Sequence, residues 1–152
     1  MSYSELYSDL VEMPGALLPI FHRIQERLGY VPQEALPEIA KALNLSRAEV
    51  HGVMTFYHDF RSEPAGRTVV KICRAEACQA MGANALVAHA EACLHTPLNS
   101  TSADGSATLE AMYCLGNCAL APAVMINGDL KGRVTPARFD ALVAAAGKAV
   151  PA

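Results

Sequence analysis

The sequence predicts an α+β protein, in which an N-terminal three-helix bundle at residues 1–66 is followed by an α/β domain at residues 67–152. Up to residue 60, apolar residues recur every three or four positions, which is the spacing of amphipathic helices. After residue 66, short runs rich in β-branched residues alternate with helical stretches in the order β-α-β-β-α. The turn-rich link Ser62-Glu-Pro-Ala-Gly66 separates the two patterns, and a chain of 152 residues can hold two such units.

The first two helices of the bundle are predicted from apolar stripes. Residues 16–28 place apolar side chains on one helical face, and Gly29 follows as a C-terminal cap. Residues 33–43 form a second stripe, with Asn44 as its stop. Residues 3–12 have a weaker pattern, which predicts only a short helix.

Ser46 and Glu49 predict the start of the third helix, because a serine followed three positions later by a glutamate forms a capping box. Residues 40–50 also resemble a helix-turn-helix superficially. Only Arg47 and His51 could contact DNA there, so this interpretation is not favoured. The inward face of the third helix is predicted to contain Val50, Val53, Met54 and Tyr57.

The charge of the chain is small and unevenly distributed. The formal net charge is −3, with −4 in residues 1–66 and +1 in residues 67–152. A charge this small excludes a general electrostatic affinity for nucleic acid or for an anionic membrane. The N-terminus lacks the pattern of a secretory signal, and no apolar run approaches the roughly 18 residues of a membrane span. We therefore expect a cytoplasmic protein without direct membrane insertion.

The second unit is predicted from strands, one strong turn and two helices. Asn127-Gly128 is typical of a two-residue hairpin, and Thr135-Pro136 supplies a capping hydroxyl and a proline for the start of the last helix. Residues 95–106 are expected to form a loop. The predicted elements are strands at 68–72, 107–113, 123–126 and 129–134, a helix at 79–94, and a last helix that buries Phe139, Leu142, Val143 and Ala146 and ends at Gly147.

Four of the five cysteines form two tight pairs, each placed directly after a predicted strand. Cys73 and Cys78 are separated by four residues, and Cys114 and Cys118 by three. In a reducing compartment such pairs indicate metal ligands before disulfides. A [2Fe–2S] cluster, structural zinc and a redox disulfide pair all remain open. The positions after strands, the 36-position interval between the pairs and the lack of a histidine at ligand spacing favour iron.

Several residues near these pairs permit two interpretations. Gly116 could let the backbone approach a sulfur at positive φ, or it could be an ordinary turn glycine. Arg74 and Glu76 could be solvated loop charges, or Arg74 could offset the negative charge of a thiolate-bound cluster. Cys93 follows Leu86 by seven residues on one apolar stripe, so a buried inert thiol is favoured over a ligand or a redox partner.

The remaining titratable residues give no sign of substrate chemistry. His51 and His58 are one heptad apart, and we interpret them as surface or interface residues of a helix. No Ser/His/Asp set, Walker loop, dinucleotide-binding glycine motif or paired-carboxylate signature is present, so we predict no catalytic residue in this chain.

Two further segments, together with the cysteine pairs, resemble a known family. Gly52-Val-Met-Thr-Phe-Tyr57 with Phe60, and the region from Gly116 to Asn127, are similar to segments of the thioredoxin-like [2Fe–2S] ferredoxins. This is the family of the small iron–sulfur subunit in the NADH dehydrogenase module of respiratory complex I. The resemblance covers about residues 12–147.

The resemblance implies a thioredoxin-like second domain and a [2Fe–2S] cluster with four ligands, Cys73, Cys78, Cys114 and Cys118. It also implies an electron carrier that docks against a flavoprotein subunit holding FMN and binding NAD. We expect the N-terminal bundle, including residues 52–60, to supply much of this contact, because a three-helix appendage has little other evident role. Pro122 resembles the cis-proline of the thioredoxin fold.

The segment from Cys73 to Gly82 looks most like the gamma subunit of soluble NAD-dependent formate dehydrogenases. That complex also has a catalytic subunit with molybdopterin and iron–sulfur centres. The alternatives are the equivalent subunit of NADH:quinone oxidoreductase or of an NAD-linked hydrogenase, and, without redox chemistry, a zinc-stabilised scaffold module. The isolated chain could also form a homodimer.

Overall fold

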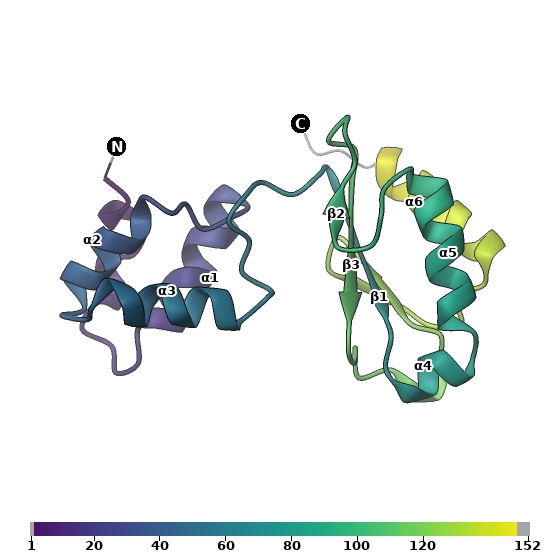
Figure 1. Ribbon diagram of the computed structural model, residues 1–152, viewed down its shortest axis with the longest axis horizontal. Helices are drawn as coiled ribbons and strands as arrows, with labels where there is room; N and C mark the ends of the chain where they lie inside the picture. Colours follow the sequence, from purple (N-terminus) through teal and green to yellow (C-terminus); the bar gives the residue numbers. More distant parts are fainter. Residues whose placement is uncertain (1, 149–152) are drawn as a thin grey trace. The chain divides into compact units, whose positions relative to one another are not determined.

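The computed structural model describes residues 2–148, and the chain divides into two compact units that join at Pro64 and Ala65. The first unit contains only helices and turns, and the second contains one sheet with its helices (Figure 1). Within residues 2–148, no helix is both long enough and apolar enough to span a membrane.

Three short helices surround the core of the first unit: α1 (Leu17–Leu28), α2 (Ala35–Ala42) and α3 (Arg47–Phe56). Two 3₁₀ turns, Ser4–Leu6 and Ser8–Leu10, replace the short helix predicted at residues 3–12. As predicted, α1 ends at Gly29, which adopts the left-handed conformation at φ +83°. The largest fully buried side chains of this unit are Tyr7, Ile20, Phe21, Ile24, Val31, Ile39 and Val50.

The capping box at the start of α3 is confirmed. The Glu49 amide donates to Ser46 Oγ at 3.2 Å, and the Ser46 amide donates to Glu49 Oε2 at 2.8 Å. Val50 and Met54 are buried as predicted, but the predicted inward position of Tyr57 is wrong, because this side chain is 44% exposed. The helix ends at Phe56 and Tyr57 has an extended backbone, so the helical periodicity no longer sets its direction.

The second unit is built on a five-stranded mixed sheet in the order β2-β3-β1-β4-β5. β1 pairs in parallel with β3, whereas β1 with β4, β2 with β3 and β4 with β5 are antiparallel. The short β2 lies inside the segment predicted to be a loop, so that prediction is wrong in part. The strands are β1 (Thr68–Cys73), β2 (Ser100–Thr101), β3 (Ala107–Met112), β4 (Val124–Ile126) and β5 (Asp129–Lys131).

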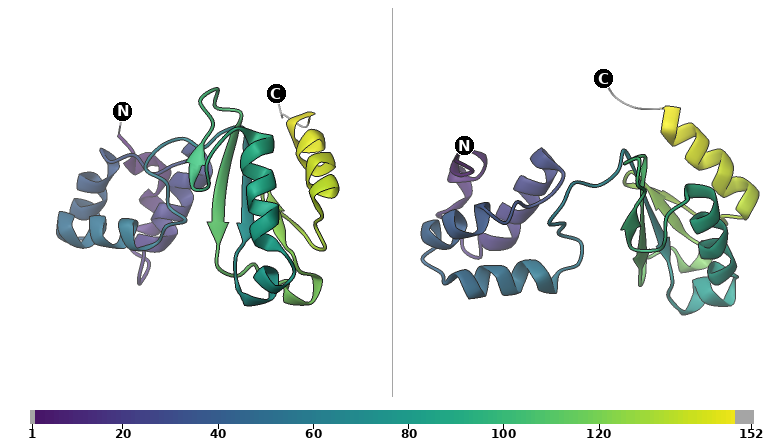
Figure 2. Two further views of the ribbon diagram at one scale, coloured as in Figure 1. Left: turned by 45° about the vertical axis from the view of Figure 1, so that its right-hand side comes forward. Right: turned by 45° about the horizontal axis from the view of Figure 1, so that its top comes forward.

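The helix predicted at residues 79–94 is two helices, α4 (Glu76–Ala80) and α5 (Ala83–Leu94). Gly82 separates them in the left-handed conformation at φ +90°, which only glycine adopts at little cost. Figures 1 and 2 show α5 and α6 side by side on one face of the sheet. The core between these two helices and the sheet contains Val70, Ile72, Leu86, Leu109, Val124 and Phe139.

The predicted hairpin and the predicted cap of the last helix are both confirmed. Asn127 at φ +49° and Gly128 at φ +90° form the turn between β4 and β5, as required for a two-residue hairpin. The Arg138 amide donates to Thr135 Oγ1 at 3.2 Å at the start of α6 (Pro136–Lys148), which extends one residue beyond the predicted end.

Candidate metal centre

The two cysteine pairs lie at one edge of the sheet, which we call the cysteine edge. Cys73 ends β1, and its register partner on the parallel strand β3 is Met112, two residues before Cys114. The Arg74 amide donates to the Met112 carbonyl oxygen at 2.6 Å, which holds the two chain segments together just beyond the strands. In Figure 1, α4 and the loop after β3 lie at the same end of the sheet. Parallel pairing thus brings together cysteines that are far apart in sequence.

The sulfur atoms of all four paired cysteines are close enough to influence one another. Burial is the main cause that raises the pKa of Cys78, and the charges of Cys73 and Cys118 raise it further. The charge of Cys114 is the main cause that raises the pKa of Cys118, with a further contribution from Cys73. Cys73 and Cys78 are buried, Cys114 and Cys118 are exposed, and none is in a disulfide. The cysteine edge therefore has an inner and an outer thiol pair.

Backbone amides donate to these sulfurs from two sides. The Gly116 amide donates to Cys114 Sγ at 3.3 Å, and Gly116 adopts φ +72°. A hydrogen bond from the backbone of Ala123, directly after the cis peptide bond between Ala121 and Pro122, lowers the pKa of Cys78. Such donors stabilise thiolates over thiols. Of the two interpretations left open for Gly116, the geometry favours a backbone that approaches a sulfur at positive φ.

Arg74 contributes a buried donor that has no acceptor in the described part of the chain. Its Nε–H is buried without a hydrogen-bond partner, although Nη2 lies 3.5 Å from Asn84 Oδ1. A buried guanidinium N–H without an acceptor is costly, and an ordered water or an anionic group would remove that cost. Arg74 directly follows Cys73. An unpartnered donor on the residue that follows Cys73 is compatible with a site that holds a negatively charged cluster.

A single metal ion and a two-iron cluster place different demands on such a site. Among residues 2–148, no three His, Cys, Asp or Glu side chains converge closely enough to hold one metal ion. A [2Fe–2S] cluster distributes four thiolates over two irons, so it does not require three side chains to meet at one ion. The arrangement of two adjacent thiol pairs is compatible with that division.

Comparisons with known proteins assign the chain to a family. Residues 3–147 match the thioredoxin-like [2Fe–2S] ferredoxins. The chain belongs to this family. A component of the NADH-quinone oxidoreductase of Rhizobium meliloti (strain 1021) is 35% identical over 129 residues, which cover 85% of this chain and 77% of the relative. The HndA subunit of the NADP-reducing hydrogenase of Solidesulfovibrio fructosivorans is 30% identical over 145 residues, which cover 93% of this chain and 85% of the relative.

Solved structures confirm the predicted thioredoxin-like α+β fold. A chain in the crystal structure of NAD⁺-reducing [NiFe]-hydrogenase in the H₂-reduced state superposes with a TM-score of 0.75 and 27% sequence identity. The match covers 89% of this chain but only 22% of the hydrogenase chain, so this protein spans about a fifth of that chain's length.

Family membership also confirms the predicted cofactor, a [2Fe–2S] cluster. The ferredoxin is an electron-transfer protein, and its relatives are subunits of oxidoreductases. This assignment decides between the three chemistries that the cysteine spacing alone left open.

The prediction of a buried Cys93 is wrong, because this residue is exposed. α5 directs Leu86, Ala90 and Leu94 into the core, whereas Cys93 lies at the edge of this stripe. A hydrogen bond joins the Cys93 thiol to Asp140 of α6. Partial burial is the main cause that raises the pKa of Cys93, and this hydrogen bond raises it further. The spacing of seven residues between Leu86 and Cys93 correctly placed Cys93 near the buried side of α5. It could not show that the buried surface ends before this residue.

Sequence reasoning also missed Gly132, which supports the turn that contains Cys118. An added Cβ at this position would lie 2.6 Å from Leu120 Cβ and 2.8 Å from Asn117 Nδ2. The position has no turn signature, because glycine is required here by close packing between segments. A glycine directly after a short strand is the one available signal for such an approach.

Proposed function

We propose that Cys73, Cys78, Cys114 and Cys118 are the four ligands of the [2Fe–2S] cluster. The position of both pairs at the cysteine edge, where β1 and β3 end side by side, is the observation that carries this assignment. Such a cluster accepts and releases one electron at a time. The chain supplies thiolates, backbone donors from Gly116 and Ala123, and a partly exposed edge at which an electron can enter or leave.

Substitution of single cysteines tests the ligand set. Each of the variants Cys73→Ser, Cys78→Ser, Cys114→Ser and Cys118→Ser is expected to lower the iron and sulfide content and to change the visible absorbance and the electron paramagnetic resonance spectrum. Cys93→Ser is the matched control and should leave iron content and both spectra unchanged. Full iron content together with unchanged absorbance and paramagnetic resonance spectra in any of the four variants would remove that residue from the set.

We further propose that the protein is the small electron-transfer subunit of an NAD(P)-linked oxidoreductase complex. The relatives from an NADH-quinone oxidoreductase and from an NADP-reducing hydrogenase support the complex I and hydrogenase alternatives over the formate dehydrogenase assignment. The latter rests only on the segment from Cys73 to Gly82. Purification of the native complex, followed by assays with quinone, hydrogen and formate, distinguishes the three. Formate-dependent NAD⁺ reduction in the purified complex would restore the formate dehydrogenase assignment.

The partner in this proposal is a flavoprotein subunit that holds FMN and binds NAD, and the N-terminal unit is its docking domain. Phe56 is 73% exposed and Tyr57 44% exposed, and their rings contact edge to face at a centroid distance of 5.1 Å. Exposed aromatic pairs of this kind are typical anchors of protein interfaces. Removal of residues 1–60 should abolish co-purification of the flavoprotein while the remaining domain keeps its cluster. Unchanged complex formation would refute the docking role.

A further inference from the structure

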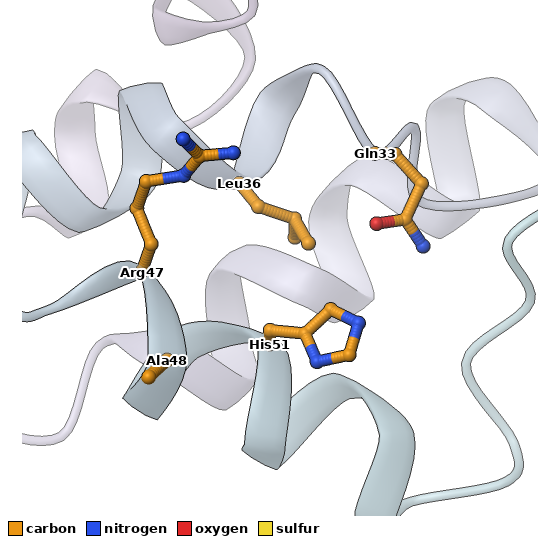
Figure 3. Close-up of a pocket in the computed structure, with 5 residues that line it drawn as sticks. All are labelled: Gln33, Leu36, Arg47, Ala48 and His51. Atoms are coloured by element: carbon orange, nitrogen blue, oxygen red, sulfur yellow. The ribbon is translucent and has the colours of Figure 1, made fainter.

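A cavity of about 470 Å³ lies between α2 and α3 in the N-terminal unit, away from the cysteines in sequence (Figure 3). Arg47 is the first residue of α3 and His51 lies one helical turn later, so both side chains reach the same side of the helix. Gln33 faces them from the segment before α2, and Leu36 of α2 projects between them (Figure 3). Ala48 completes the lining.

Each of the three polar side chains of this pocket can donate hydrogen bonds, and none of them has a partner among the described residues. Within the described residues, the side chains of Gln33, Arg47 and His51 have no hydrogen-bond or ion-pair partner. No acidic side chain lines the cavity. The nearby carboxylate of Glu49 is already bound to the amide and the hydroxyl of Ser46, both at 2.8 Å, and therefore does not pair with Arg47. The pocket consequently presents a guanidinium, an imidazole and an amide without compensating negative charge.

This combination is complementary to a carboxylate on a short apolar stem. A guanidinium offers two parallel N–H donors that match the two oxygens of a carboxylate, and an imidazole and an amide can donate further hydrogen bonds. Leu36 and Ala48 provide apolar surface for the methylene groups of such a side chain. We propose that the pocket receives an aspartate or glutamate side chain of the partner flavoprotein subunit, which rests on the docking role proposed above.

The donor side chains of the pocket, Gln33, Arg47 and His51, are exposed, so a side chain of a partner protein can reach them. Phe56, the exposed aromatic residue, lies nine positions after Arg47. At about 1.5 Å and 100° per residue, Phe56 lies roughly 13 Å along α3 but on the face opposite Arg47, so the pocket is a contact point separate from this aromatic side chain. The capped N-terminus of α3 also uses Ser46 and Glu49 for its own amides, so the donors of the pocket are side chains placed at the surface.

The test compares charge reversals in the native complex, purified through a tag on the full-length chain. Arg47→Glu should weaken retention of the flavoprotein at least about tenfold, because a charge pair becomes a repulsion. Lys41→Glu, an exposed residue of α2 that does not line the pocket, makes the same charge change and should alter retention less than twofold. Arg47→Gln, which keeps the size but removes the charge, should have an intermediate effect. Cluster absorbance and the thermal midpoint serve as folding controls in each variant.

Each result either supports or overturns the proposal. Equal retention for the two charge reversals overturns it. Millimolar inorganic phosphate that shifts the nuclear magnetic resonance signals of His51, combined with full retention of the Arg47→Glu chain, also overturns it in favour of a free anion. If the wild-type chain carries its cluster but co-purifies with no flavoprotein, the proposed function fails first and the inference fails with it. Loss of retention only in the Arg47 variants supports the assignment.

Discussion

Gly132 packs so closely against Leu120 that a Cβ added at position 132 would lie 2.6 Å from Leu120 Cβ. Real Cβ atoms do not approach this closely, so a side chain here must displace the turn that contains Cys118. We expect Gly132→Ala to destabilise the protein by about 1–3 kcal/mol, the usual cost of overpacking. It should also lower the cluster content of the purified chain. Iron analysis and thermal unfolding measure the two effects.

Gly147→Ala is the control for this substitution, because an added Cβ at this helical position meets no atom of another described segment within 4 Å. In a helix, this change is expected to stabilise slightly, by about 0.5–1 kcal/mol. Cluster content that is the same in the Gly132→Ala and Gly147→Ala proteins would show that the Cys118 turn does not depend on the small size of Gly132.

The buried Nε–H of Arg74 predicts an effect on the reduction potential of the bound cluster. A positive charge near the cluster favours the reduced form, so Arg74→Gln should lower the potential. The expected scale is about 59 mV, which corresponds to a tenfold change in a one-electron equilibrium, or less. Potentiometric titration followed by electron paramagnetic resonance measures the shift. Arg138→Gln on α6 is the matched control, and equal potentials in the two variants would make Arg74 an ordinary loop charge.

The parts of this structure that sequence could predict are those set by local chemistry. The capping box at Ser46, the αL cap at Gly29 and the Asn127-Gly128 turn are each specified by residues within a few positions of one another. The spacing of the four cysteines, each pair directly after a predicted strand, was also local information. It limited the possible sites to an iron–sulfur cluster, structural zinc or a redox disulfide pair. The split between α4 and α5 was missed, because a helical pattern continues across Gly82 and only the backbone reveals its positive φ.

Features that depend on distant packing could not be predicted in this way. The exposure of Cys93 depends on where the sheet stops covering α5, and the role of Gly132 depends on a contact with Leu120 across the loop. The convergence of Gln33 with Arg47 in one pocket requires the angle between α2 and α3, which no periodicity provides. Tyr57 illustrates the same limit, because the end of α3 decides its direction.

The hydrogen bond between His89 and Asp140 links α5 to α6 and makes stability depend on pH. His89 Nε2 lies 2.7 Å from Asp140 Oδ1, and this bond is the main cause that lowers the pKa of Asp140, with a smaller contribution from Cys93. Because the folded pKa lies below the ordinary value of 3.8, the stabilisation is complete above that value and is lost as pH falls through the folded pKa. Asp140→Asn should therefore reduce the loss of stability on acidification.

Chemical denaturation at a series of pH values between about 6 and 2 measures this difference. His89→Ala should reproduce the weaker acid dependence, because it removes the main cause of the pKa shift. Wild-type acid dependence in both variants would mean that the bond is replaced by water without a difference in free energy.

Substitution of the exposed residue Phe56 can distinguish an effect on binding to the flavoprotein from an effect on the stability of the chain. Because this side chain is 73% exposed, Phe56→Ala should change the free energy of unfolding of the isolated chain by less than about 0.5 kcal/mol. If α3 contacts the flavoprotein, the same change should weaken the complex at least about tenfold, which is the effect of losing an aromatic anchor. Leu28→Ala on α1, 39% exposed in the wild type, is the matched apolar control and should leave the complex intact. Equal affinities in the Phe56→Ala and Leu28→Ala chains would place the interface on another surface, since an aromatic anchor that is removed from an interface cannot leave its affinity unchanged.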